Sequence, residues 1–300
     1  MKYNIQQVKD AVVIKGVQDF ELPHIFECGQ CFRWWREDDG SYTMTAKGKV
    51  INLCRRENSL IIHPTTLEEF HQVWYSYFDM DRDYGTIKKV LSENDPVMEK
   101  ATAFGHGIRI LRQDPWETLI SFIISSNRGI SMIQKSIEDL SLRYGTYIGE
   151  YRGRKYYDFP KPQALLNQTV EAIRLSKTGY RAKYIVDAAA VAAENQIELY
   201  QVHNLSTENA RKTLLRISGV GPKVADCILL FSMDKQDAFP IDTWVKRVME
   251  FFYVPQGIPL NQLQDYAGKR FGAYAGFAQQ YLFYYARELG IGKGGQGRNF

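Results

Sequence analysis

A lysine and an aspartate near a glycine turn offer the most reactive chemistry in this sequence. The turn is GVG at 219–221, Lys223 follows it after one proline, and Asp242 lies 19 residues further on, before the helical run TWVKRVM. A cation in the first turn of a helix is unfavourable by about 0.3–1 kcal/mol. This penalty favours the neutral amine, which is a nucleophile. Asp242 is interpreted either as an N-cap or as a carboxylate that faces the lysine at the mouth of a pocket.

The residues around this turn, 207–233, are expected to form a helix–hairpin–helix. A first amphipathic helix is predicted to end at Ile217, and the proline after the turn suits the start of the second helix. Gly219, Val220 and Gly221 then direct free backbone N–H groups outward from that helix N-terminus, which favours an anion such as phosphate. A positive φ and close approach of a phosphate explain both glycines. An ordinary helical hairpin with a glycine turn remains the alternative.

The composition indicates a folded chain of about two domains. With 300 residues, 45% of them hydrophobic and 13% aromatic, the chain has enough apolar surface for a large core and is not mainly disordered. A net charge of +4 permits a nucleic-acid partner without requiring one. The four cysteines are too sparse for a disulfide framework. The polar N-terminus and the absence of a long apolar run predict neither a signal peptide nor a membrane span.

The pattern of apolar residues along the sequence changes after about residue 65. Before it, short β-branched and aromatic runs alternate with turns, which predicts an antiparallel meander. After it, apolar residues recur at helical spacing, and nearly everything is expected to be helical. We therefore predict an α+β fold in which a small N-terminal antiparallel sheet domain with flanking helices (1–105) packs on a mostly helical body (106–290), followed by a flexible, basic, Gly-rich tail (291–300). The predicted strands are 11–15, 31–37, 41–46, 49–55 and 59–63.

Two other patterns are interpreted as packing. The aromatic stripe Phe70, Trp74, Tyr77 and Phe78 has helical spacing and is expected in the core. Cys28-x-x-Cys31 lacks the second ligand pair that a structural zinc site needs.

Five motifs in one order over essentially the whole chain resemble the 8-oxoguanine DNA glycosylase family, within the helix–hairpin–helix DNA glycosylases. The most specific, fourth along the chain, is L-x-x-I-x-G-V-G-x-K…D, within which GVGPKVADC is typical of that family. The others are GQCFRWW (29–35), FIISSN (122–127), GYRAKY (179–184) and AGFAQQYLF (275–283). The resemblance implies a bifunctional DNA glycosylase/AP lyase that flips 8-oxoguanine out of duplex DNA and excises it.

The resemblance also implies the catalytic roles. Lys223 corresponds to the lysine that attacks the anomeric carbon of the damaged nucleotide and forms a Schiff base, which allows β-elimination of the 3′ phosphate. Asp242 corresponds to the aspartate that stabilises positive charge developing on the sugar. In the base pocket, the carbonyl of Gly29 would accept the hydrogen on ring nitrogen seven that guanine lacks. Cys227 and Phe283 would cover the two faces of the base, and Gln279 would bond its Watson–Crick edge.

A third group would contact the DNA opened by base flipping. Asn127 resembles the asparagine that enters the gap, Tyr180 the aromatic wedge, and Arg181 the arginine on the estranged cytosine. A helix C-cap for Asn127 and a helix-start packing role for Tyr180 are the alternatives. Eukaryotic members usually carry a second arginine where this chain has Met132, which predicts relaxed opposite-base specificity. They usually carry a histidine where it has Trp244.

Two other functions stay open at this point. A non-catalytic helix–hairpin–helix DNA-binding module would need the GVG turn but neither Lys223 nor Asp242, and a glycosylase for another damaged purine would share the fold. No cysteine follows Cys227, so an iron–sulfur cluster is excluded, and no metal or other cofactor is expected. The expected partner is double-stranded DNA containing 8-oxoguanine, with no membrane, and the chain is expected to be a monomer. Its expected location is the prokaryotic cytoplasm near the nucleoid, or otherwise the nucleus, and it is not expected to be secreted.

Overall fold

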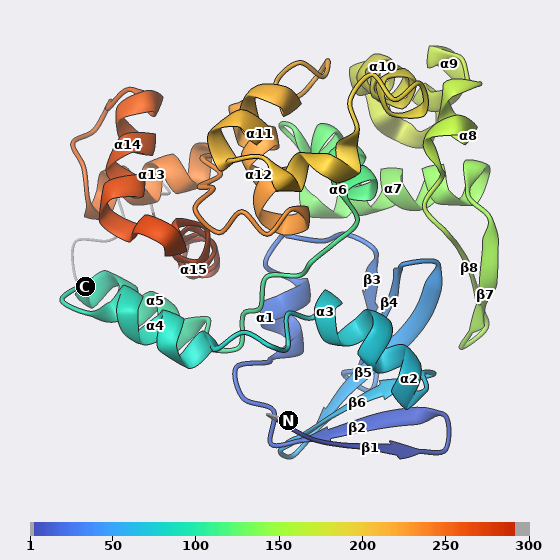
Figure 1. Ribbon diagram of the computed structural model, residues 1–300, viewed down its shortest axis with the longest axis horizontal. Coiled ribbons are helices and arrows are strands. Elements are labelled where there is room, and N and C mark those ends of the chain that lie inside the picture. Colours follow the sequence, from blue (N-terminus) through green and yellow to red (C-terminus); the bar gives the residue numbers. More distant parts are fainter. Residues whose placement is uncertain (1–2, 292–300) are drawn as a thin grey trace.

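The computed structural model describes residues 3–291 and has a sheet on one side of a larger helical body (Figure 1). The six strands of this sheet all pair antiparallel in the order β1-β2-β6-β5-β4-β3. Their bounds are β1 (Asn4–Val8), β2 (Ala11–Lys15), β3 (Trp34–Arg36), β4 (Tyr42–Ala46), β5 (Lys49–Arg56) and β6 (Ser59–His63).

The expected meander holds only for β3 to β6. The β1–β2 hairpin joins the sheet through β6, which follows 44 residues after β2 ends (59 − 15). β1 was not predicted because its sequence NIQQV is mostly polar and exposed, as suits the edge of a sheet.

Short helices cover the sheet. They are α1 (Leu22–Phe26), α2 (Leu67–Glu69), a π-helical turn (Phe70–Trp74) and α3 (Tyr75–Tyr77). Thr66 caps α2 by accepting a hydrogen bond from the backbone N–H of Glu69 at 3.1 Å. The aromatic stripe is buried in one cluster with residues of the sheet such as Ile14 and Leu53, so its interpretation as core packing is confirmed.

The next two helices, α4 (Tyr84–Ser92) and α5 (Pro96–Phe104), pack with the helical body rather than with the sheet. Tyr84 meets Phe277 edge to face with ring centroids 5.5 Å apart. Asp95 accepts hydrogen bonds from Tyr253 at 3.1 Å and from Arg270 at 2.6 Å. The boundary expected at residue 105 assigned α4 and α5 to the sheet domain. Their buried apolar residues instead belong to the core of the helical body.

The helical body consists of α6 (Pro115–Ser125), α7 (Ile130–Tyr144), α8 (Pro162–Leu166), α9 (Val170–Ile173), α10 (Ala182–Ala193), α11 (Thr207–Leu214), α12 (Pro222–Ser232), α13 (Thr243–Phe252), α14 (Leu260–Phe271) and α15 (Ala275–Leu289). A π-helical segment (Arg174–Thr178) and 3₁₀ turns at Gly179–Arg181, Leu199–Asn204 and Gly272–Tyr274 connect them. Asp residues cap two of these helices, α6 and α13; Asp114 accepts from Trp116 N at 3.0 Å at the start of α6.

The expectation of a nearly all-helical body is wrong for one segment. Residues 147–157 form a separate two-stranded antiparallel sheet, β7 (Tyr147–Tyr151) and β8 (Arg154–Tyr157), whose turn contains Gly153 at φ 74°. Its sequence YIGEYRGRKYY is rich in tyrosine, which favours strands. Residues 292–300 of the predicted tail lie outside the described residues, and among residues 3–291 no helix is long and apolar enough to cross a membrane.

Candidate active site

The hairpin between α11 and α12 places one of its two glycines differently from the sequence expectation. The first helix ends at Leu214, not at Ile217, because the chain continues in a tighter turn in which Ile217 N donates to Leu214 O at 3.0 Å. Gly219 has φ 83°, as expected, but Gly221 is the N-cap of α12 with φ −92°, so the expected positive φ was wrong for Gly221. Val220 between them is buried.

The close approach that Gly219 permits is to another side chain. A Cβ at this position would lie 2.6 Å from Cγ of Tyr184, so only glycine fits against the start of α10. A Cβ at Gly221 would meet nothing within 4 Å. Gly221 is exposed, and among the described residues no side-chain cap forms at the start of α12. The first-turn N–H groups of α12 could therefore bind an anion, and phosphate binding at this turn stays a prediction.

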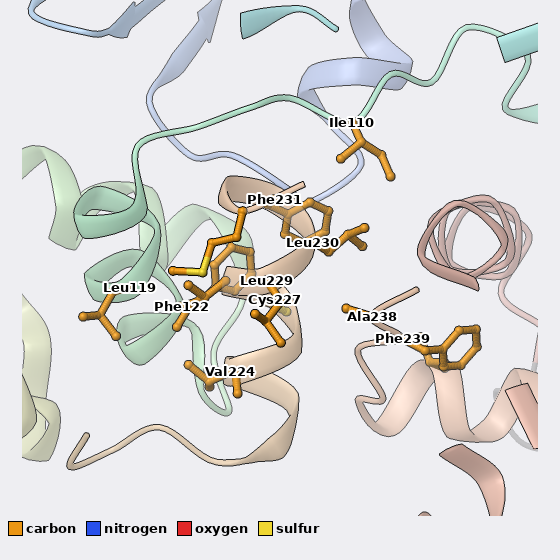
Figure 2. Packing of buried hydrophobic residues seen from close by; sticks show 14 of the residues in the cluster. Ile110, Leu119, Phe122, Val224, Cys227, Leu229, Leu230, Phe231, Ala238 and Phe239 are labelled. Atoms are coloured by element: carbon orange, nitrogen blue, oxygen red, sulfur yellow. The ribbon is translucent and has the colours of Figure 1, made fainter. Parts of the chain in front are cut away.

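Packing of α6 on α12 determines where Lys223 lies. Figure 2 shows Leu119 and Phe122 of α6 on one side and Val224 and Cys227 of α12 on the other, and the ring of Phe122 stacks on Phe231 with centroids 5.5 Å apart. This contact pairs the last turn of α6 with the last turn of α12, and the Lys223 side chain at the start of α12 reaches the same Phe122 ring.

At that junction the Lys223 Nζ lies beside two neutral groups. Its Nζ lies 3.4 Å from Oγ of Ser125 and 4.9 Å from the centroid of the Phe122 ring, and the side chain is half-buried. The lysine is therefore held by an aromatic face and a hydroxyl.

Asp242 reaches the same place from α13. Its Oδ1 accepts a hydrogen bond from Val245 N at 2.8 Å, which confirms the N-cap interpretation. Its side chain and that of Lys223 both line one cleft of about 660 Å³. Trp244, one of the two residues that depart from the family pattern, also borders it. The other residues that line this cleft are Ser125, Ser126, Asn127, Arg128, Gly129, Ile241, Thr243, Lys246 and Leu260.

Cys227 lies one turn beyond Lys223 and is buried. Burial raises the pKa of its thiol to about 12; the positive Lys223 acts in the opposite direction, and the Asp226 and Asp242 carboxylates add to the increase. The cysteine is therefore a neutral packing surface beside the lysine rather than a thiolate nucleophile.

A second group of predicted residues gathers where α15 passes the start of the GQ segment. Gly29 has φ 81°, and a Cβ there would lie 3.5 Å from Phe283 Cε1 and 3.9 Å from Ile130 Cδ1. Gln279, one turn before Phe283, is buried, and its Oε1 has no hydrogen-bond partner among the described residues. Because Ile130 follows Gly129 of the lysine cleft, this group adjoins the cleft.

The residues expected to contact opened DNA come from the α6–α7 loop with the first turn of α7, and from the 3₁₀ turn before α10. Asn127 is exposed and follows α6 with φ 52°. This left-handed conformation is typical of the residue just after a helix, as the alternative of a C-cap role predicted. Tyr180 is 59% exposed and Met132 40% exposed. Arg128 links the loops by donating to the Lys177 carbonyl.

Arg181 makes contacts within the protein. It is buried, its Nη2 donates to the backbone carbonyl of Ser126, and its guanidinium carbon lies 4.4 Å from the centroid of the Tyr180 ring. The hydrogen bond to Ser126 uses Nη2 and fixes the backbone next to Asn127, while Nε has no hydrogen-bond partner among the described residues. The contact of Arg181 with an estranged cytosine stays a prediction.

Two cations of the cleft were missed from the sequence. Arg128 follows Asn127 directly, and Lys246 lies one turn into α13. Basic residues beside the SSN motif and after the Asp242 cap were the available signal, but isolated cations are common on helix surfaces.

Comparisons with known proteins agree with this arrangement. A family model described as 8-oxoguanine DNA glycosylase, N-terminal domain, matches residues 12–119. The N-glycosylase/DNA lyase of Arabidopsis thaliana is 31% identical over 281 residues, which cover 88% of this chain and 77% of the plant protein. The probable N-glycosylase/DNA lyase of Methanothermobacter thermautotrophicus is 28% identical over 307 residues, covering 92% of this chain and 96% of that protein.

A solved structure is similar over the sheet and the helical body alike. The Clostridium acetobutylicum 8-oxoguanine glycosylase/lyase, in complex with double-stranded DNA containing cytosine opposite 8-oxoguanine, superposes with a TM-score of 0.94. It is 45% identical, and the match covers 97% of this chain and 100% of that chain.

Proposed function

The chain belongs to the 8-oxoguanine DNA glycosylase family, and from that premise we propose that Lys223 is the nucleophile with which it excises 8-oxoguanine from double-stranded DNA. The enzyme is an N-glycosylase and AP lyase. The observation that carries the assignment of residues is that Lys223 and Asp242 line one cleft.

The chemistry requires an amine. The neutral Lys223 Nζ attacks the anomeric carbon, the bond from that carbon to the base breaks, and the base leaves with the bonding electrons and takes up a proton. Opening of the sugar ring then gives a Schiff base, which acidifies the neighbouring C2′ hydrogen, so that β-elimination expels the 3′ phosphate. Water in place of lysine would give no imine and hence no strand cleavage.

Asp242 contributes a fixed negative charge. The sugar becomes positively charged as the base departs, and a preorganised carboxylate stabilises that charge without reorganising. Its hydrogen bond from Val245 N holds the carboxylate at the N-terminus of α13, and Asp242 lines the cleft.

The target base must leave the duplex to reach this cleft. We assign Asn127 and Tyr180 to the gap that it leaves, since both are exposed on loops tied together by Arg128 and Arg181. The open N-terminus of α12 at Gly221 suits a DNA phosphate.

We assign the flipped base to Gly29, Cys227, Gln279 and Phe283, of which Gly29 and Phe283 lie side by side. The aromatic ring of Phe283 and the neutral thiol of Cys227 offer stacking surfaces. The buried Oε1 of Gln279, which lacks a partner among the described residues, suits the polar edge of a base. The Gly29 carbonyl would accept the N7 hydrogen of 8-oxoguanine and would face a lone pair in guanine. An enzyme with this substrate works in the compartment that holds the chromosome, which is the cytoplasm of a prokaryote or otherwise the nucleus.

Duplexes that differ at a single base test the substrate assignment. Release of free base is measured from duplexes that carry 8-oxoguanine, guanine or an alkylated adenine at the same position. We expect release of 8-oxoguanine with strand cleavage and no release of guanine. Release of alkylated adenine without 8-oxoguanine would assign the chain to another damaged purine. Binding without release would indicate a DNA-binding module.

A further inference from the structure

The backbone on both sides of Gly29 is held by side chains from distant parts of the chain. Arg287 Nη2 donates to the carbonyl of Glu27 at 2.6 Å, and Gln280 Nε2 donates to the carbonyl of Cys28 at 2.8 Å. On the other side, Gln113 Nε2 donates to the carbonyl of Gln30 at 2.8 Å. Within the described residues, no hydrogen bond ends on the carbonyl between them, that of Gly29.

Two of these donors extend from the same side of α15. Gln280 and Arg287 are seven residues apart, which is about two helical turns, so their side chains project in nearly the same direction. Phe283 lies between them in sequence, and its ring is 5.5 Å from the Arg287 guanidinium carbon. The helix that carries the stacking ring thus also holds the segment that carries Gly29.

A glycine in the left-handed region needs such support. At φ 81°, Gly29 has no Cβ to limit its backbone, and the direction of its carbonyl depends on how the neighbouring peptides are fixed. A recognition group must stay within about 0.5 Å of its productive position, and this requires supporting hydrogen bonds around it. Gln280 is buried, and its amide donates to the carbonyl of Cys28, which would otherwise be buried without a hydrogen-bond partner.

We propose that Gln280 and Arg287 are positioning residues that hold the Gly29 carbonyl in place and thereby set the discrimination of 8-oxoguanine from guanine. This inference rests on the proposed function, because it assigns the Gly29 carbonyl to the N7 hydrogen of the lesion. It makes base recognition depend on two polar side chains of α15 that never touch the substrate. Arg287 adds a further constraint, since its Nη1 lies 3.8 Å from a Cβ placed on Gly29 and is buried without a hydrogen-bond partner among the described residues.

The variants Gln280→Met and Arg287→Met remove each donor while keeping an unbranched side chain. Arg287→Lys keeps a donor that can reach Glu27. Glu288→Gln is the matched control, because Glu288 is the other hydrogen-bond partner of Arg287 Nη2 and its loss leaves the bond to Glu27 intact. Thermal melting of each variant shows whether the fold is kept.

Three quantities are measured with each purified full-length chain. They are the single-turnover rate of 8-oxoguanine release, the rate of strand cleavage on a preformed abasic duplex, and the ratio of affinities for lesion and undamaged duplex. Abasic DNA needs the Lys223 cleft but no base pocket. We expect both methionine variants to release 8-oxoguanine roughly tenfold more slowly or worse, with a lower affinity ratio, because a buried carbonyl loses its donor. Cleavage of abasic DNA should stay within about twofold, Arg287→Lys should recover part of the rate, and Glu288→Gln should match wild type.

Other outcomes overturn the inference. Unchanged release of 8-oxoguanine in both methionine variants would show that Gly29 needs no support from α15. Equal losses on lesion and abasic DNA would show a general structural role. Failure of the wild-type chain to release 8-oxoguanine would refute the proposed function itself, and the inference with it, which separates that failure from the other two.

Discussion

Replacing Asp242 by asparagine separates the two roles of this side chain. The carboxylate caps α13 through its 2.8 Å hydrogen bond from Val245 N, and it also lines the cleft with Lys223. Asparagine keeps an oxygen that accepts the capping bond, and the two residues are about equally good N-caps. Only the negative charge is lost.

The expected magnitudes differ for stability and for activity. Loss of the charge at the N-terminus of α13 costs about 0.3–1 kcal/mol of unfolding free energy through the helix macrodipole. Removal of a preorganised group that stabilises transition-state charge costs about 10²- to 10³-fold in rate. We therefore expect Asp242→Asn to melt close to wild type while its single-turnover excision of 8-oxoguanine falls by at least one order of magnitude.

Two variants complete the design. Asp242→Ala removes both the cap and the charge, so it should lose about 1 kcal/mol more stability than Asp242→Asn with a similar rate. Asp83→Asn makes the same change at the N-cap of α4, where Asp83 accepts from Thr86 N at 3.1 Å, and should leave excision unchanged. Excision by Asp242→Asn within about twofold of wild type would refute the catalytic role and leave Asp242 as a cap only.

Three further predictions concern specificity, affinity and pH. Met132 offers no hydrogen-bond donor to the orphan base, so the wild-type chain should excise 8-oxoguanine opposite all four bases. Met132→Arg should raise the preference for cytosine roughly tenfold or more, measured by excision opposite each base. A strong cytosine preference in wild type that the substitution leaves unchanged would contradict this. The logarithm of DNA affinity should fall linearly with the logarithm of salt, by about 0.9 per phosphate contacted, and a flat plot would argue against phosphate binding. Burial raises the pKa of Glu117, on α6, from 4.5 to about 7. Between pH 4.5 and 7 the unfolded chain has lost this proton while the folded chain keeps it, so the free energy of unfolding should fall as the pH rises through this range. Chemical denaturation of Glu117→Gln should show a flatter dependence of that free energy on pH, and equal slopes for the variant and wild type would contradict this.

Local sequence signals predicted much of the fold because several elements are specified by their own residues. The alternating run SLIIH gave β6, and Asp242 before a helical run gave the N-cap of α13. The motif resemblance also predicted that Gly29 and Phe283 belong to one base pocket. They lie 254 residues apart in sequence, and the Phe283 side chain on α15 contacts Gly29. Spacing within one element could not have shown that contact.

Other features depend on contacts that no local pattern contains. Arg181 has an ordinary sequence context, and only the fold brings it to the Ser126 carbonyl. The requirement for glycine at position 219 comes from Tyr184, which lies 35 residues earlier. The hairpin 147–157 is short and interrupts a helical region, so its tyrosines were outweighed by the pattern of its neighbours. Helices α4 and α5 are amphipathic, but amphipathicity does not specify which core they join.

Covalent trapping tests the central claim most directly. The chain is incubated with an 8-oxoguanine duplex and sodium borohydride, which reduces an imine to a stable secondary amine, and the cross-linked peptide is identified by mass spectrometry. We expect wild type to give an adduct at Lys223, and Lys223→Gln to give neither adduct nor excision while still binding the lesion duplex. An adduct of wild-type yield in Lys223→Gln, or a wild-type adduct mapped to another residue, would contradict the assignment of Lys223 as the nucleophile.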